Sequence, residues 1–213
     1  SWARTFVGGM GVDGVLSEQI VYPADSLVKI PEHLDFKEAA TFTIAGLTAW
    51  SAIVTHGKTL PGEWVLLQGT GGVSIFAAQL AKAMGARTIM TTSSAEKADF
   101  VKKMFGVTAT VNYHDPNWTD QVKDITQGAG VDVVVDVAGG DILSQSLRIC
   151  NYGARVGVIG ILSGQDSNIH IRDLLSHQVQ IRGIMMESTE ELRALMRAVD
   201  VLKLKPAIDK TFP

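Results

Sequence analysis

Three small residues follow an apolar stretch with the spacing Gly69-x-Gly71-x-x-Ser74. Glycines allow a tight turn and let the backbone approach a ligand, and the helix that follows offers unpaired N–H groups and the positive end of its dipole. Because this combination suits a pyrophosphate, the turn predicts a dinucleotide-binding site. The third position is serine rather than glycine, so the turn taken alone is also compatible with an ordinary strand-to-helix connection.

The next apolar run ends in consecutive hydroxyl side chains: Thr91, Thr92, Ser93 and Ser94. NAD-binding proteins carry an acid at this point, about 20 residues after the first glycine, to bind the ribose hydroxyls. Here no acid precedes Glu96, and Lys97 follows it. Hydroxyl groups and a lysine can bind a 2′-phosphate, so this stretch favours NADP(H) over NAD(H). The alternative is that Ser93 is a helix N-cap and Lys97 a solvated helix residue.

Two further glycine turns follow predicted strands. They contain Ala138, Gly139 and Gly140, and then Ile159, Gly160, Ile161 and Leu162. Ligands of open parallel sheets bind beyond the carboxyl ends of the strands, and both turns belong to that edge. They are therefore predicted where a nicotinamide ring would pass, although two tight loops without a ligand role are an equal alternative.

Other side chains give little support for metal or nucleophilic chemistry. The five histidines lack a metal-binding spacing, and one cysteine cannot build a structural zinc site or an internal disulfide. Cys150 is expected at a helix end as a packed residue. Asp132 and Asp136 project to the same side of one strand; we interpret Asp136 as ordering the following loop or meeting the cofactor, and Asp132 as the exposed start of the strand.

Strands and helices must alternate to bring these turns to one edge. Apolar runs predict strands at 64–67, 88–90, 108–112, 131–137, 155–159 and 179–185. Helical periodicity predicts helices at 36–54, 73–84, 94–105, 118–126 and 142–150, then at 171–176 and from 189 until Pro206 ends the last one. The alternation with short links predicts an α/β fold with a doubly wound, parallel six-stranded Rossmann sheet.

Cap residues mark the predicted helix starts. Capping-box spacing is present at Asp35 with Glu38, at Ser93 with Glu96 and at Ser188 with Glu191, and Asp115 is the expected N-cap before Pro116. The last helix is expected to bury one apolar face: Leu192, Leu195, Met196, Val199 and Leu202. Before residue 31, short strands are expected at 16–21 and 27–30, whose partners would lie elsewhere.

Composition restricts the class of protein. Hydrophobic residues make up 46% and charged residues 19%, as in a globular protein. A net charge of -3 gives no electrostatic reason to expect nucleic-acid or anionic-membrane partners. No apolar run approaches the roughly 20 residues of a membrane span, and no signal peptide is visible, so a cytoplasmic location is expected.

Several segments together resemble one family. The segments AATFTIAGLTAW (39–50), VLLQGTGGVSIFAAQLAKAMGA (65–86), TTSSAEK (91–97) and GVDVVVDVAGG (130–140) are similar to the medium-chain dehydrogenase/reductase superfamily. The nearest branch is the zinc-independent quinone-oxidoreductase-like group, also called zinc-type alcohol dehydrogenase-like. The resemblance implies three parts: residues 1–31 as the end of a GroES-like catalytic domain, 32–203 as the Rossmann domain, and 204–213 as the return to the catalytic domain.

The resemblance also implies site residues. Those for the phosphates and adenosine of NADP(H) are Thr48, Gly71, Gly72, Val73, Ser74, Thr92, Ser93, Ser94, Lys97 and Tyr113. The nicotinamide side would be lined by the two later turns, 138–140 and 159–162. Zinc-dependent members carry a cysteine ligand where this chain has Ile44, so no zinc is expected, and no catalytic residue is assigned. The implied partners are a small-molecule substrate and a second copy of the chain, through residues 180–185.

The expected function is hydride transfer between NADP(H) and a small carbonyl, enone, quinone or alcohol. A nucleotide-binding sensor or structural module without turnover is the alternative from another class. An S-adenosylmethionine-dependent methyltransferase also uses a glycine turn, but it would be expected to carry an acid at the end of the second strand, which is lacking here.

Overall fold

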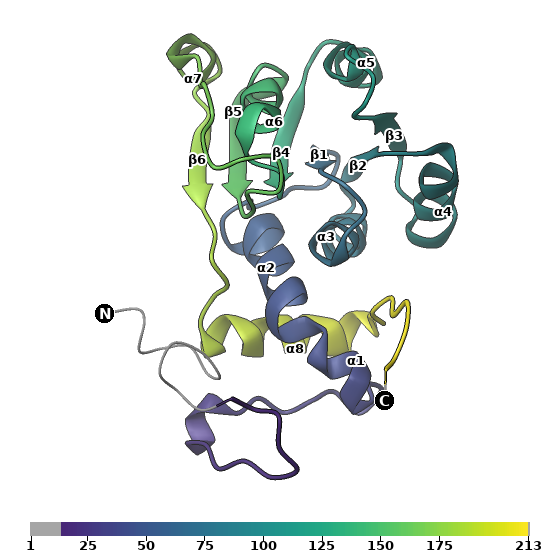
Figure 1. Cartoon of the computed structure of the whole chain (residues 1–213), viewed down its shortest axis with the longest axis vertical. Coiled ribbons are helices and arrows are strands. Elements are labelled where there is room, and N and C mark those ends of the chain that lie inside the picture. The colour runs from purple at the N-terminus through teal and green to yellow at the C-terminus, as the bar shows by residue number, and fades with distance from the viewer. Residues whose placement is uncertain (1–13, 213) are drawn as a thin grey trace.

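The computed structural model describes residues 14–212, and one parallel sheet in the order β3-β2-β1-β4-β5-β6 forms its centre (Figure 1). The strands are β1 (Trp64–Leu67), β2 (Arg87–Thr92), β3 (Ala109–Asn112), β4 (Val131–Asp136), β5 (Cys150–Val158) and β6 (Gln180–Gly183). This is the strand order of doubly wound dinucleotide-binding folds, so the predicted fold class is confirmed. The order reverses between β1 and β4, which is where ligands bind in such sheets.

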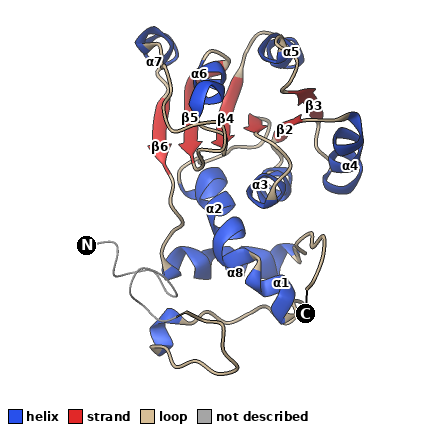
Figure 2. Ribbon diagram, in the orientation of Figure 1, coloured by secondary structure: helices blue, strands red, loops and turns tan. Residues whose placement is uncertain are grey.

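The helices follow the predicted alternation (Figure 2). One helical run is built of α1 (Phe36–Ala40), the π-helix η3 (Phe42–Gly46), α2 (Leu47–Trp50) and the π-helix η4 (Ser51–Thr55). The others are α3 (Gly72–Ala83), α4 (Ala95–Phe105), α5 (Trp118–Ile125), α6 (Gly140–Leu147), α7 (Ile171–His177) and α8 (Thr189–Leu202). No helix within residues 14–212 is both long enough and apolar enough to cross a membrane.

Two hydrophobic cores cover the two faces of the sheet, and β1 contributes to both. Val65 and Leu67 belong to the core formed with the 36–55 helical run, α3, α4 and α8. Trp64 and Leu66 belong to the core formed with α5 and α6. Side chains of a strand alternate between faces, so a strand buried on both sides must be apolar throughout. This explains why β1 is entirely apolar and why four of the six residues of β4 are valines.

The strands predicted before residue 31 are wrong. Residues 16–21 and 27–30 form no strand, and the only regular element in the described part of this segment is a short 3-10 helix, η2 (Ala24–Ser26). Strands need neighbours to pair with, and the sheet ends at β3 and β6 without offering one to this segment. Residues 1–13 and 213, which belong to the predicted outer parts, lie outside the described residues.

The prediction between α6 and β5 is also wrong. The helix expected to reach Cys150 ends at Leu147, and Cys150 begins β5, where it pairs with Val131 of β4. Pairing with a neighbouring strand is a tertiary contact that overrides local helical periodicity. The last strand is shorter than predicted: β6 spans Gln180–Gly183, whereas a strand was expected over 179–185.

The capping predictions have mixed outcomes. Asp35 and Glu38 form the predicted reciprocal capping box, and Ser188 accepts a hydrogen bond from the Glu191 N–H. Asp115 does not cap α5; its Oδ1 accepts from the Asn117 N–H at 2.8 Å, within the preceding turn. Leu202 was expected inside but is exposed, because it ends α8 beyond the buried face.

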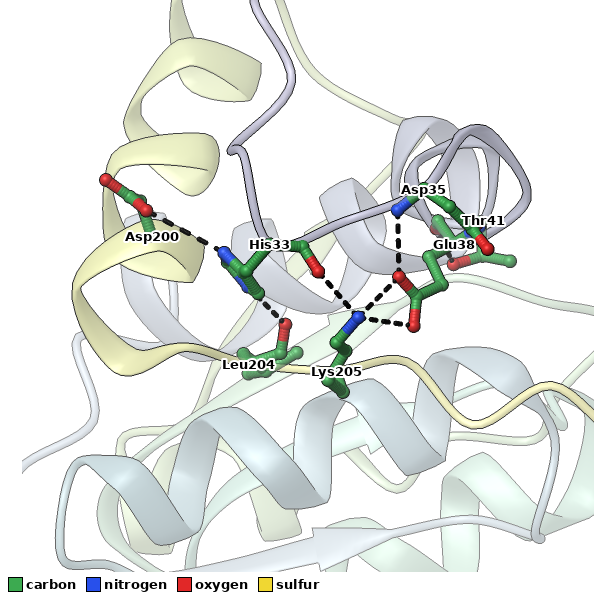
Figure 3. A network of polar contacts seen from close by, with 7 residues as sticks. All are labelled: His33, Asp35, Glu38, Thr41, Asp200, Leu204 and Lys205. Atoms are coloured by element: carbon green, nitrogen blue, oxygen red, sulfur yellow. Dashed lines mark hydrogen bonds and ion pairs between the residues drawn. The ribbon is translucent and has the colours of Figure 1, made fainter.

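A polar network joins the two segments at which the chain enters and leaves the sheet domain (Figure 3). Lys205 Nζ donates to the His33 carbonyl at 2.6 Å and to both carboxylate oxygens of Glu38 at 2.8 and 2.7 Å. The His33 ring lies 3.2 Å from the Leu204 carbonyl through Nε2. The hydrogen bond from Lys205, with a smaller effect of the Asp35 N–H, lowers the pKa of Glu38. Residues 33–38 and 204–205 are therefore held side by side.

Candidate functional site

The turn after β1 has open space around two glycines, Gly69 and Gly71, which differ in backbone conformation. Gly69 has φ +69°, a left-handed conformation that favours glycine, whereas Gly71 has an ordinary φ of -79°. A Cβ added at Gly71 would meet no atom within 4 Å. The protein's own packing therefore does not require glycine at position 71, and its missing side chain leaves room for a ligand to approach the backbone.

The start of α3 is suited to an anion. No side chain caps this helix, and its first turn contains no acid. The unpaired N–H groups and the helix dipole therefore face the open side of the turn. Ser74 is buried, and its Oγ donates to the Gln68 carbonyl at 2.6 Å, which fastens the helix to β1. For Ser74, as for Gly72 and Val73, the predicted cofactor contact would come from the main-chain N–H.

The hydroxyl side chains at the end of β2 have different partners. Thr91 is buried and its Oγ1 accepts from the Gly69 N–H at 2.9 Å, while Thr92 Oγ1 donates to the Ser94 carbonyl at 3.3 Å. Ser94, not Ser93 as predicted, is the N-cap of α4, and it accepts from the Lys97 N–H. The extended backbone at Ser94 decides this, since the cap is the last residue before helical dihedrals begin.

This leaves Ser93 and Lys97 as the polar pair at the end of β2. Lys97 Nζ lies 3.2 Å from Ser93 Oγ at the surface. Tyr113 follows β3 and lies beside them, because its N–H donates to the Thr92 carbonyl at 3.1 Å. Its ring is partly exposed and lies 4.5 Å from the His114 ring. The structure thus brings together the residues predicted for the adenosine end.

The two later glycine turns pack against each other. Ala138 accepts a hydrogen bond from the Ser163 N–H at 2.7 Å, and Gly139 forms an isolated bridge with Gly164. A Cβ at Gly140 would lie 2.6 Å from the Ser163 carbonyl oxygen. Close packing of the two main chains therefore explains these glycines without a ligand, in contrast to Gly71.

Apolar side chains on the second of these turns remain exposed. Ile161 is 61% and Leu162 is 85% exposed, at the carboxyl edge of the sheet. Gly160 packs on Val137, and the Ile159 N–H donates to the Asp136 carbonyl at 2.7 Å. The turns predicted for the nicotinamide side are thus brought together. Thr48 is buried in α2, which packs on α3.

Sequence reasoning missed Gln68, which is buried between the two halves of the site. Its side chain contacts Asp136 and the Ala138 N–H. Asp136 orders the following loop as predicted, since its Oδ1 accepts from the Gly139 N–H at 2.7 Å. Burial raises the pKa of Asp136, although hydrogen bonds from Gly139, Gln68 and Ala138 act in the opposite direction. A polar residue at the end of an otherwise apolar strand, directly before the glycine turn, was the signal.

Two further expectations concern Asp132 and Cys150. Asp132 is not an exposed strand start: it is partly buried and accepts from the Trp64 N–H at 2.7 Å and from Asn151 Nδ2 at 2.8 Å. Cys150 is buried as expected, and burial raises the pKa of its thiol to about 12. Within residues 14–212, no group of three or more histidine, cysteine or acidic side chains is placed to hold a metal ion.

These features define a dinucleotide-binding domain of the Rossmann class. The profile of the zinc-binding dehydrogenase family matches residues 72–200. The chain therefore belongs to the zinc-binding dehydrogenases, within the medium-chain dehydrogenase/reductase superfamily.

Two curated relatives illustrate this membership. The chain is 35% identical, over 94% of its length, to a zinc-type alcohol dehydrogenase-like protein of Schizosaccharomyces pombe, of which it covers 60%. It is 30% identical, over 99% of its length, to human quinone oxidoreductase, of which it covers 64%. The chain thus spans less than two thirds of the length of these relatives.

Solved structures give the same grouping. A protein from Sinorhizobium meliloti 1021, described as a candidate alcohol dehydrogenase, matches with a TM-score of 0.90 and 40% identity, over 96% of this chain and 59% of that one. An NAD-dependent alcohol dehydrogenase matches with a TM-score of 0.84 and 32% identity, over 95% of this chain and 59% of that one.

Proposed function

We propose that the chain is the cofactor-binding part of an NADP(H)-dependent oxidoreductase. It would transfer a hydride between NADP(H) and a small carbonyl, enone, quinone or alcohol. The observation that carries this proposal is the Lys97–Ser93 pair, 3.2 Å apart, at a strand end without an acid. An ammonium and a hydroxyl group suit a 2′-phosphate, whereas an NAD site would carry a carboxylate there.

Each part of the site has a separate task in this proposal. The cofactor would donate or accept the hydride, and the protein would bind and orient the cofactor and exclude water. The N–H groups at the start of α3 bind the pyrophosphate, with Gly71 leaving space for it. The packed turns at 138–140 and 159–164 support the nicotinamide end, where Ile161 and Leu162 offer an apolar surface.

We propose that the reaction needs no zinc. Ile44 lies on η3 at the position where the resemblance places a cysteine ligand, and an isoleucine side chain cannot bind a metal. Two relatives are named for such acceptors: quinone oxidoreductase, from human, and 2-haloacrylate reductase, from a Burkholderia species, which is 32% identical to this chain. Metal analysis of the full-length protein by mass spectrometry tests this, and stoichiometric zinc would contradict it.

Cofactor choice is the sharpest test, because one similar solved structure is named as an NAD-dependent enzyme. Affinities for NADPH and NADH would be measured by nicotinamide fluorescence on the full-length protein. We expect Lys97→Ala to weaken NADPH binding about tenfold, as when one charge-assisted hydrogen bond is lost, and to leave NADH binding unchanged. Lys103→Ala, an exposed lysine on the same helix, is the matched control. Equal affinities in the wild type, or no effect of Lys97→Ala, would contradict the proposal.

A nucleotide-binding module without turnover is the second candidate. Full-length protein would be assayed for NADPH consumption with a panel of quinones, enones and aldehydes. Consumption supports the oxidoreductase, whereas tight NADPH binding without any consumption supports the module.

We also propose the arrangement of the whole protein. Residues 1–31 and 204–213 would belong to a second, GroES-like domain, since the described segments leave the sheet side by side at the Lys205 network (Figure 3). Two copies would pair through the edge of β6, whose four residues are all exposed. An unpaired edge strand presents free N–H and C=O groups to a partner strand.

A further inference from the structure

A buried glutamine joins the two turns of the site at the point where the strand order reverses. Gln68 directly follows β1 and is 2% exposed, and Asp136, the last residue of β4, is 0% exposed. Ser146 of α6 completes this buried group, also at 0% exposure. Buried polar groups of this kind are costly unless every one of them has a partner.

Every polar atom of the Gln68 side chain has a partner. Its Nε2 donates to Asp136 Oδ2 at 3.0 Å and to Ser146 Oγ at 2.9 Å. Its Oε1 accepts from the Ala138 N–H at 3.1 Å. These partners fix the amide orientation, because an N–H group must face the oxygen and a carboxylate must face the NH₂ group. Gln68 therefore has no free group with which to contact a ligand.

The same residue is connected to both ends of the site. Its main-chain carbonyl accepts from Ser74 Oγ at 2.6 Å, which ties it to α3 and the pyrophosphate turn. Its side chain reaches the 138–140 turn directly at Ala138, and again through Asp136, which accepts from the Gly139 N–H at 2.7 Å. A shift of either turn relative to the other would break several of these hydrogen bonds together.

We propose that Gln68 is a positioning residue that sets the separation between the pyrophosphate turn and the nicotinamide-side turn. This inference rests on the proposed function. A dinucleotide gains affinity over its halves only if both subsites are held at the separation that the ligand spans. Gln68 would act on that gain through Asp136 and Ala138, without contacting the cofactor itself.

The experiment compares a whole cofactor with one half of it. Dissociation constants for NADPH and for adenosine 2′,5′-bisphosphate would be measured on full-length protein by calorimetry, with thermal unfolding to confirm folding. Gln68→Met keeps the side-chain length but removes both donor and acceptor. We expect it to weaken NADPH binding about tenfold or more, as expected for loss of a hydrogen bond to a charged group, and to change the binding of the half-ligand much less.

A reciprocal exchange provides the rescue test. Asp136→Asn alone makes the NH₂ group of the new asparagine face the NH₂ group of Gln68. Gln68→Glu alone makes the new carboxylate face the carboxylate of Asp136. In the double variant Gln68→Glu/Asp136→Asn, the new carboxylate accepts from the Ala138 N–H and from the new amide, whose oxygen still accepts from Gly139. The double variant is expected to recover most of the NADPH to half-ligand affinity ratio.

The control is the same substitution at a comparable pair. Gln121 lies on α5, and its Nε2 donates to Oδ2 of Asp115, which precedes the helix, at 2.7 Å. Gln121→Met should leave the ratio of NADPH affinity to half-ligand affinity unchanged. An unchanged ratio in folded Gln68→Met would overturn the inference while leaving the proposed function intact. If Gln68→Met does not fold, the comparison of Asp136→Asn with the double variant decides. The inference is supported if the double variant recovers the affinity ratio that Asp136→Asn loses, and it is overturned if both variants lose the ratio equally.

The preference of the wild type for NADPH or NADH is measured first. If the wild type prefers NADH, the proposed NADP(H) dependence fails, and the ratio is measured with NADH and AMP instead, so the inference is still decided. Failure of the wild type to bind either dinucleotide overturns both.

Discussion

Glycines at the edge of this sheet are present for two different physical reasons. Gly140 has φ +51°, and an added Cβ would lie 2.6 Å from the Ser163 carbonyl oxygen, so the fold itself requires glycine. Gly71 has an ordinary φ and open space around it. Sequence alone does not separate these cases, because all of these glycines follow strands in similar short motifs.

Alanine substitutions should therefore have opposite effects at the two positions. We expect Gly71→Ala to change the free energy of unfolding by less than about 1 kcal/mol, since its dihedrals suit any residue, yet to weaken NADPH binding. Gly140→Ala should lose about 2 kcal/mol or more, because a left-handed residue with a steric clash is strained. Urea unfolding and cofactor titration measure both. A large stability loss for Gly71→Ala would contradict the open-space interpretation.

Asp136 should give a measurable pH dependence. Its native pKa is raised above the ordinary aspartic acid value of 3.8, so the folded chain binds this proton more tightly than the unfolded chain does. The contribution to stability is fully present below pH 3.8 and is lost as the pH rises through the raised native pKa. The difference in unfolding free energy between wild type and Asp136→Asn should therefore fall with rising pH over that window.

Other carboxyl groups change stability with pH in the opposite direction, but their contributions cancel when wild type and variant are compared. Glu38 and Asp200 have lowered pKa values through contacts with Lys205 and Lys203, respectively. Both groups are present in wild type and variant alike. A difference curve that is flat or rises with pH would show that Asp136 is not the cause.

At the scale of the element, the two serines before α4 have different roles: Ser94 caps the helix, and Ser93 is proposed to contact the cofactor. Ser94 →Ala removes the side chain that accepts from the Lys97 N–H, and it should destabilise the protein by about 1 kcal/mol. Ser93→Ala should change stability by less than about 0.5 kcal/mol, as for a surface substitution, but should weaken NADPH binding. Thermal unfolding and fluorescence titration distinguish the two, and a reversed order of the stability losses would contradict this assignment.

Element boundaries were predictable where local chemistry decided them. The Asp35–Glu38 capping box starts α1 as predicted, because both partners lie within one turn. The start of β5 at Cys150 was missed, since it depends on pairing with Val131, which is distant in sequence. The absent strands at 16–21 and 27–30 have the same cause, because a strand exists only with a partner.

At the scale of the whole molecule, the exposed edge of β6 leads to a prediction about assembly. We expect the full-length protein to be a dimer in analytical ultracentrifugation and Ile181→Asp to shift it to monomer, because a charge on an edge strand opposes strand pairing. Val201→Asp, an exposed apolar position on α8, is the matched control and should leave the dimer intact. A wild-type monomer, or a dimer that persists in Ile181→Asp, would contradict this interface.

The sequence by itself determined the alternation of strands and helices, the parallel sheet and the glycine turn after β1, because hydrophobic periodicity and glycine spacing are local properties. It also identified the acid-free end of β2. Only the tertiary structure decided which serine caps α4, which glycines the packing itself requires, and that Gln68 joins the two turns through Asp136 and Ala138. These features depend on which backbone groups from distant segments meet at the carboxyl edge of the sheet, and no local pattern specifies those meetings.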